Sequence, residues 1–280
     1  MLSRRAFLLL AASALLPCVA HAEEPVLSLG IVPINSVLAL MRAHQPIREH
    51  LQNETGARVD LFTSPDFFTF LNESLEGRYD LLITPPHFGA MSIARGYRPL
   101  VRYSAPVELV LVVGRDSAIR GLQDVRGQTI GVSSRLSMAT IQSIAQLETQ
   151  NLYVDEDYAL REYVSAGAAL SAVAFGDADG TFTARHALRL IPEELVDALR
   201  FVDLPGSPPH IMTLAHERLG EARIRALREA LLRFPDTEAG RQFFDQSGLG
   251  GYTTIDRDDL VNLQATVLLT RRLLARSARQ

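Results

Sequence analysis

Three serines and an arginine lie close together between a short apolar stretch and an amphipathic one. The segment Gly131–Gln142 reads GVSSRLSMATIQ and holds Ser133, Ser134, Arg135 and Ser137. This pattern predicts a strand that runs through a polar turn into a helix. The first N–H groups of a helix have no internal partners, and the helix dipole is positive there. We therefore expect a small anion to bind at this turn; the alternative is that the serines only cap the helix.

No set of residues in the chain has the spacing of a familiar catalytic or metal centre. Cys18 is the only cysteine, and the serines of GVSSRLS lack the flanking glycines of a hydrolase nucleophile turn. No HExxH pattern occurs, and His186 and His210 have no further ligand at metal-binding spacing. We predict a protein that binds a ligand without catalysis, cofactor or metal. The alternative is an enzyme on the same scaffold, because a fold does not settle a function.

The first 22 residues have the pattern of a cleavable export signal. An arginine pair precedes an apolar run at 6–16, and a small-residue cleavage site ends at Ala22. We expect cleavage after Ala22, with export by the twin-arginine or the ordinary route. Cys18 would leave with the signal, so we expect a soluble mature protein with no disulfide and no lipid anchor.

Charge and length narrow the choice of partners. The net charge of the 280-residue chain is −4, and loss of the two signal arginines would take it to −6. A mildly acidic chain without a basic cluster excludes nucleic acid as the expected partner. Removal of the signal leaves 258 residues, which is enough for one large hydrophobic core or two smaller ones.

Strand-like and helix-like segments alternate along the chain. The first unit has strands predicted at 25–33, 58–62, 79–84 and 100–103, with helices at 38–53, 67–76 and 90–95. A second unit has strands at 107–114, 128–132, 159–164 and 199–202, a short strand or turn at 178–182, and helices at 168–175 and 185–191. A proline-rich segment at 204–210 leads to a strand at 211–215 and to helices at 221–234, 236–247 and 258–276. The alternation predicts open α/β sheets, and the proline-rich segment indicates a return to the first unit.

Ligands of open α/β sheets bind at loops beyond the carboxyl ends of the strands. Three such loops in the first unit hold Asn35, the pair Ser64 and Asp66, and the pair His87 and Phe88. Asp66 also suits the cap of the helix that follows it. His87 either bonds the ligand or packs under its loop.

Several segments resemble one family of exported binding proteins. They are LGIVP at 29–33, TSPDF at 63–67, RYDLLITPPHFGAM at 78–91, VELVLVVGRDSAIRGLQDVRGQTIGV at 107–132, SAGAALSAVAFGDADG at 165–180 and FFDQSGLGGYTTID at 243–256. The chain resembles the phosphate, phosphite and phosphonate-binding (PhnD-like) family of type II periplasmic binding proteins over nearly its whole mature length. The resemblance implies a two-lobed α/β fold, with two open, mostly parallel sheets joined by two crossing segments and a ligand cleft between the lobes.

The resemblance also implies a domain division and a role. Residues 1–22 would be the signal peptide, 23–105 plus 211–280 lobe 1, and 106–210 lobe 2. The implied protein is a periplasmic monomer that closes around a small oxyanion or organic anion of the phosphonate kind. It would deliver this ligand to the permease of an ABC importer in the inner membrane. Alternatively, it would signal to a membrane histidine kinase.

Site residues carry over from the family by position. A Ser-Thr-Ser-Gly turn at a helix start grips the oxyanion in that family, and Ser133, Ser134 and Ser137 lie at the matching place. Arg135 departs from the turn and either bonds the anion or lies in solvent. Met138 and Phe88 make the expected cleft more apolar, which favours an organic anion over a bare inorganic one. The residues expected to bind the ligand are Asn35, Ser64, Asp66, Phe67, His87, Phe88, Tyr103, Ser133, Ser134, Arg135, Ser137, Met138 and Thr181.

Overall fold

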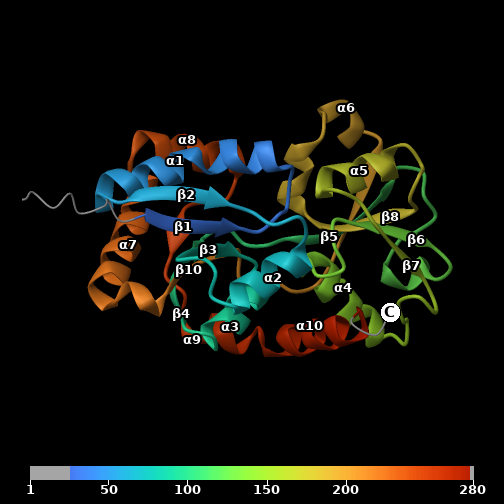
Figure 1. Ribbon diagram of the computed structural model, residues 1–280. Helices are drawn as coiled ribbons and strands as arrows, with labels where there is room; N and C mark the ends of the chain where they lie inside the picture. The colour runs from blue at the N-terminus through green and yellow to red at the C-terminus, as the bar shows by residue number, and fades with distance from the viewer. Residues whose placement is uncertain (1–25, 278–280) are drawn as a thin grey trace, which may run out of the picture.

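The chain folds into two α/β lobes that lie side by side (Figure 1). The computed structural model describes residues 26–277, so the predicted signal peptide at 1–22 lies outside the described residues. Within residues 26–277, no helix is both long enough and apolar enough to cross a membrane. We call the lobes the six-stranded lobe and the five-stranded lobe after their sheets.

The sheet of the six-stranded lobe has the order β11-β4-β10-β3-β1-β2. Its strands are β1 (Val26–Ile31), β2 (Arg58–Phe62), β3 (Leu81–Thr84), β4 (Tyr97–Tyr103), β10 (Met212–His216) and β11 (Tyr252–Thr253). β1 pairs in parallel with β2 and with β3. All four residues of β3 are buried, as expected of a central strand covered on both faces.

Helices cover both faces of this sheet (Figure 1). One face packs against α1 (Val37–Thr55), α7 (Glu221–Arg233) and α8 (Glu238–Ser247), and the other against α2 (Phe67–Leu75) and α3 (Pro86–Ile93). In α1 the buried side chains Leu40, Ile47 and Leu51 recur at helical spacing. The helix begins after the cap Ser36 and ends at Gly56, whose φ of 64° suits a residue without a side chain.

The sheet of the five-stranded lobe has the order β7-β6-β8-β5-β9. Its strands are β5 (Leu109–Gly114), β6 (Thr129–Val132), β7 (Ala159–Glu162), β8 (Gly180–Ala184) and β9 (Leu199–Asp203). The helices between them are α4 (Met138–Glu148), α5 (Ala166–Ala174) and α6 (Glu193–Val196), and the short 3₁₀ helices are η1 (Leu122–Val125) and η2 (Arg185–Leu190). The predicted helix at 185–191 is therefore a 3₁₀ helix.

The two-lobed α/β fold is confirmed, but the sheets are mixed and not mostly parallel. In the six-stranded sheet β10 is antiparallel to both of its neighbours, β3 and β4. In the five-stranded sheet β5 is antiparallel to both of its neighbours, β8 and β9. Each of these strands follows a segment that crosses from the other lobe. The crossing segment arrives at the end of the sheet where the parallel strands finish. The strand that follows it therefore runs antiparallel to its neighbours.

Two predicted helices have different bounds in the structure. The segment around His87 is not a loop, because α3 begins at Pro86 and not near Ala90; proline suits the first position of a helix, where no N–H is needed. The helix predicted at 258–276 is two helices, α9 (Arg257–Val261) and α10 (Gln264–Ser277). Between them, the Leu263 N–H bonds the Leu260 carbonyl three residues back, and the buried Leu263 side chain lies at the bend.

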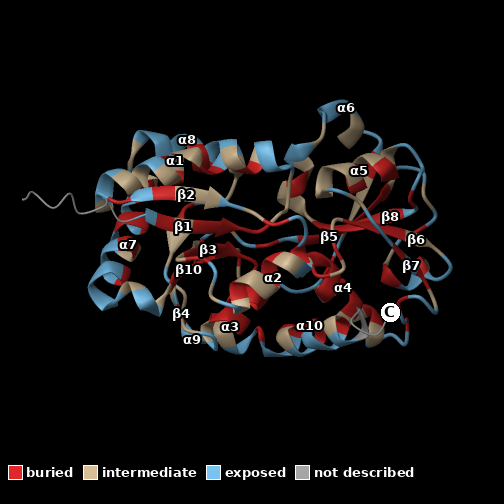
Figure 2. Cartoon of the chain, in the orientation of Figure 1, coloured by how far each residue is buried: buried red, intermediate tan, exposed pale blue. Residues whose placement is uncertain are grey.

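The core is continuous between the lobes (Figure 2). One cluster joins Phe70 and Phe88 of the six-stranded lobe to Leu111 and Ile141 of the five-stranded lobe. Helix α10 runs along both lobes beside α3 and α4 (Figure 1) and adds Leu269 to this cluster. The lobes therefore share part of their hydrophobic core.

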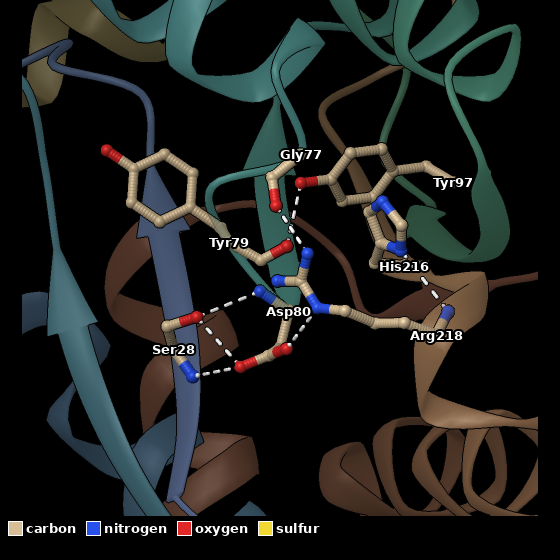
Figure 3. A network of polar contacts seen from close by, with 7 residues as sticks. All are labelled: Ser28, Gly77, Tyr79, Asp80, Tyr97, His216 and Arg218. Atoms are coloured by element: carbon tan, nitrogen blue, oxygen red, sulfur yellow. Dashed lines mark hydrogen bonds and ion pairs between the residues drawn. The ribbon is translucent and has the colours of Figure 1, made fainter.

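A polar network joins β1 to the segment just before β3 and to the segment just after β10 (Figure 3). The Asp80 carboxylate accepts hydrogen bonds from the Ser28 N–H at 2.9 Å, the Ser28 hydroxyl at 2.8 Å and the Arg218 Nε at 2.8 Å. The Tyr97 hydroxyl donates to the Tyr79 carbonyl at 2.7 Å. The network stabilises the end of the sheet opposite to the candidate site.

Candidate functional site

A cavity of about 350 Å³ lies between the lobes. Strand residues from both sheets line it, among them Ile31 of β1, Ile83 of β3 and Phe182 of β8. The connections that follow these strands form its walls. This is the position at which open α/β sheets bind ligands.

Five helices begin at the wall of this cavity. The lining residues at or near their first turns are Ala39 of α1, Phe67 of α2, the cap Pro85 of α3, Met138 of α4 and Ala166 of α5. The positive ends of five helix dipoles therefore meet around one space. Such an arrangement favours an anionic ligand over a cationic one.

The cavity wall is largely apolar and has few polar groups. The polar side chains that line it are Asn35, His44, Tyr103, Ser133, Ser137, Thr183, His186, Arg189, Gln246 and Ser247. Among residues 26–277, no aspartate or glutamate lines the cavity, and Arg189 is the lining residue with a permanent charge. The wall is therefore net positive.

Arg189 reaches from the five-stranded lobe to the six-stranded lobe. It belongs to η2, directly after β8, and its guanidinium lies against Gly248, the residue at which α8 ends. A Cβ placed on Gly248 would be 3.1 Å from the Arg189 Cζ. Arg189 has no ion-pair partner within the described part of the chain, so its donors are available to a ligand.

Two histidines of the cavity wall are held neutral. Burial lowers the pKa of His44, and its Nδ1–H donates to the Leu40 carbonyl at 2.9 Å. Its Nε2 is then an acceptor. Burial, together with the charge of Arg189, lowers the pKa of His186, whose ring lies 5.2 Å from that of His210. Burial and the neighbouring His186 and Arg102 lower the pKa of His210 to about 3.

The serine turn divides its hydroxyls between the cavity and the backbone. The Ser137 hydroxyl caps α4 by accepting from the Thr140 N–H at 3.2 Å, and it also bonds the Thr140 hydroxyl at 2.7 Å. The Ser134 hydroxyl accepts from the Leu136 N–H at 3.0 Å. The Ser133 hydroxyl has no hydrogen-bond partner among residues 26–277 and lines the cavity. Ser133 is thus the serine of this turn whose hydroxyl remains for a ligand.

Six of the residues predicted from the sequence meet at the interlobe cavity: Asn35, Phe67, Tyr103, Ser133, Ser137 and Met138. Asp66, Ser134 and Arg135 line a second cavity of about 400 Å³, where Phe67 also lies. Arg135 is paired there: its two terminal nitrogens bond the Asp155 carboxylate at 2.9 Å each. Asp66 caps α2 by accepting from the Thr69 N–H at 2.7 Å.

The other four predicted residues line neither of these cavities. The Ser64 hydroxyl bonds Glu73 and Tyr79, and the Thr181 hydroxyl is buried in β8. His87 is fully buried, and its Nε2–H donates to the Leu136 carbonyl of the other lobe at 3.1 Å. Burial lowers the pKa of His87 to about 4. Phe88, also fully buried, packs edge-on against Phe67 with 6.2 Å between ring centroids.

Sequence reasoning missed several cavity residues. His186 and Arg189 come shortly after the end of a strand, which is the position that identified the other loops. They were not selected because residues 185–191 were predicted to form a helix. His44 and Gln246 lie on helices α1 and α8 and reach the cavity only because those helices pack at the lobe interface. Within the described residues, no group of three or more His, Cys, Asp or Glu side chains has the geometry to hold a metal ion.

Two mixed sheets, each with one antiparallel strand that follows a crossing, and a cavity between the lobes match the fold of type II periplasmic binding proteins, and solved structures share this fold. PhnD1 of Prochlorococcus marinus, solved in complex with methylphosphonate, superposes with a TM-score of 0.77 at 14% identity, over 89% of this chain and 98% of that one. A binding protein of an ABC phosphonate transporter from Pseudomonas aeruginosa gives 0.75 at 18% identity, over 89% and 88%. A protein of Xanthomonas citri bound to ATP gives 0.72 at 18% identity, over 90% and 99%.

The family is identified from the chain itself. Residues 29–260 match the family described as "ABC transporter, phosphonate, periplasmic substrate-binding protein". This match covers well over half of the 280 residues, and the protein belongs to that family. The predicted resemblance is therefore confirmed, and the protein is a member of a family of solute-binding proteins.

Proposed function

We propose that the protein captures a small anion of the phosphonate kind in the interlobe cavity and delivers it to an ABC importer. The observation that carries the proposal is that five helix starts and Arg189 surround a cavity with no carboxylate in its wall among the described residues. The family, whose members are substrate-binding proteins of phosphonate transporters, supports the importer as partner. The protein would act in the periplasm as a monomer, after cleavage behind Ala22.

The proposed capture of the anion depends on the fact that both lobes contribute residues to the cavity wall. We assign residues 23–105 plus 211–280 to lobe 1 and 106–210 to lobe 2. Ile31 and Phe67 then face Ser133 and Phe182 across the ligand. A ligand that touches both sides stabilises the closed arrangement over an open one, because its contacts are complete only when the lobes close. The importer would recognise the closed form.

Binding is tested by thermal unfolding of the mature protein with phosphate, phosphite, methylphosphonate, methanesulfonate and acetate. A ligand that binds only the folded state raises the midpoint with concentration. We expect at least one phosphorus oxyanion to do so, with its affinity lowered about tenfold or more by Ser133→Ala, because an anion loses a hydrogen bond. Ser137→Ala is unsuitable, since loss of the α4 cap costs about 1 kcal/mol by itself.

Ser171→Ala is the matched control, because Ser171 lies on α5 outside the cavity wall. Its binding should equal that of the wild type. If no anion in the series raises the midpoint, or if Ser133→Ala and Ser171→Ala bind alike, the proposed site is wrong. For the importer, uptake of the bound anion into cells should stop when this protein is deleted and return when it is supplied again.

A further inference from the structure

We infer that the cavity selects an anion with an apolar body and without a cationic group, and that Arg189 binds its anionic end. This inference rests on the proposed function and specifies the ligand of the same site. Three features of the cavity carry it: the absence of carboxylates from its described wall, the apolar composition of that wall, and the lack of an ion-pair partner for Arg189 among residues 26–277.

The charges of the wall exclude an ammonium group on the ligand. A buried cation needs a nearby carboxylate, because removing it from water costs several kcal/mol per ion. Among residues 26–277, no aspartate or glutamate lines the cavity. The five helix starts and Arg189 would in addition repel a cation. Amino acids and aminoalkyl phosphonates are therefore poor ligands for this wall.

The apolar part of the wall is too large for a bare oxyanion. Aliphatic and aromatic side chains from both lobes line the space, among them Ile31, Leu40, Phe67, Ile83 and Phe182. An inorganic phosphate would leave these surfaces in contact with water. A ligand with an alkyl or aryl body would cover them, and burial of each methylene strengthens binding about fourfold. A volume of about 350 Å³ is within the range of pockets for small organic molecules.

Arg189 is the anion-binding side chain that the wall offers. Its planar guanidinium can donate two parallel hydrogen bonds to a phosphonate, sulfonate or carboxylate. Arg135, for which the sequence left anion binding and exposure to solvent open, already donates from both terminal nitrogens to Asp155. The Ser133 hydroxyl and the Asn35 amide line the same cavity and can complete the anion contacts. The anionic end would then lie at the Arg189 side and the body along the apolar wall.

The test is calorimetric titration of the unliganded mature protein with matched ligands. The series is inorganic phosphate, methylphosphonate, butylphosphonate, phenylphosphonate, 3-aminopropylphosphonate, butanesulfonate and pentanoate. We expect butylphosphonate to bind at least tenfold more tightly than methylphosphonate and inorganic phosphate, in line with the gain of about fourfold per methylene. We expect 3-aminopropylphosphonate, which replaces the terminal methyl by ammonium, to bind at least tenfold more weakly than butylphosphonate. The sulfonate and carboxylate identify the preferred anionic group.

Arg189→Gln tests the anion-binding residue. We expect it to weaken butylphosphonate binding by about ten- to a hundredfold, as for loss of hydrogen bonds to a charged group. Arg185→Gln is the matched control, because Arg185 lies in the same 3₁₀ helix, is paired with Glu108 and Asp203, and does not line the cavity. It should bind butylphosphonate within about twofold of the wild type, and thermal unfolding of both variants shows that they are folded.

The outcomes separate the two proposals. Equal or tighter binding of inorganic phosphate, equal binding of the aminoalkyl ligand, or equal effects of Arg189→Gln and Arg185→Gln would overturn the inference while leaving anion binding itself in place. If none of the anions binds, the proposed function fails, and the inference fails with it.

Discussion

The role of each charged side chain in this protein depends on whether the fold places an oppositely charged group beside it. Arg135 and Arg189 lie on the same lobe, yet Arg135 is neutralised by Asp155, whereas Arg189 has no counter-charge in the cavity wall among the described residues. Asp80 shows the structural use of a charge. Burial alone raises the pKa of its carboxyl, but hydrogen bonds from Ser28 and the charge of Arg218 outweigh burial and hold the pKa below its ordinary value (Figure 3).

Asp80 predicts an acid dependence of stability. Because its folded-state pKa is below the ordinary value of 3.8, the carboxylate stabilises the fold above that pH, and this contribution is lost as the pH falls through the folded-state pKa. Asp80→Asn should lower the free energy of unfolding by about 1–3 kcal/mol at pH 7, and the difference from wild type should shrink below about pH 4. Urea unfolding of the wild type and of Asp80→Asn between pH 3 and pH 7 measures this difference in the free energy of unfolding.

The control for this prediction is Asp116→Asn. Asp116 is exposed and makes no hydrogen bond through its carboxylate among residues 26–277, so the substitution should change stability by less than about 0.5 kcal/mol. A constant difference between Asp80→Asn and wild type across the pH range would contradict the role given to Asp80.

At the scale of elements, the start of α8 depends on close backbone packing. The helix was predicted to start at 236, but its cap is Thr237, whose hydroxyl accepts from the Gly240 N–H at 2.9 Å. The chain doubles back so tightly here that Gly240 lies against the carbonyl of Phe234. A Cβ on Gly240 would be 1.8 Å from that carbonyl oxygen, which is far inside contact distance.

Gly240→Ala should therefore destabilise the protein. Alanine normally favours a helix over glycine by about 1 kcal/mol, but here the backbone of Phe234 would have to move, and we expect a loss of at least about 2 kcal/mol. Gly114→Ala is the comparison, since a Cβ there meets nothing within 4 Å and should be neutral or stabilising by up to about 1 kcal/mol. Chemical denaturation of both variants measures the change in the free energy of unfolding. A stabilising effect of Gly240→Ala would contradict the close contact between Gly240 and the Phe234 carbonyl.

At the scale of the whole molecule, the lobes are joined by more than the two crossings. The shared core and α10 both bridge them: Gln142 of α4 donates to the Thr266 hydroxyl at 2.7 Å, and Arg272 pairs with Glu148 at 2.5 Å. His87 adds a buried hydrogen bond from α3 to the Leu136 carbonyl. In the proposed capture of a ligand, the lobes would move around this shared side.

The shared core predicts that the lobes unfold together. Leu269 on α10 is 6% exposed and belongs to the cluster that spans both lobes, while its neighbour Leu268 is 65% exposed. Leu269→Ala should lower the free energy of unfolding by about 2–5 kcal/mol and shift one single calorimetric transition. Leu268→Ala should change it by less than about 0.5 kcal/mol. Two separate transitions, with only one moved by Leu269→Ala, would show that the lobes unfold independently.

Local patterns in the sequence determined the elements and the class of protein. The apolar runs of β1, β3 and β5 and the cap Asp66 follow from neighbouring residues alone, and these elements agree with the predicted ones. The segments resembling phosphonate binders led to the family that the match over 29–260 establishes. Each of these inferences depends on residues close together in the chain.

Which side chains face the cavity was decided only by the tertiary structure. Asn35, Ser133 and Met138 line the cavity, in line with their positions after strand ends, whereas His87 lies in the first turn of α3 and is buried in the shared core. A strand end indicates where a ligand binds, but the pairing of distant charges and the packing of helices decide which groups remain free. The ion pair with Asp155 occupies the Arg135 guanidinium, so it is not available to a ligand. The approach of η2 to α8 brings Arg189 into the cavity wall.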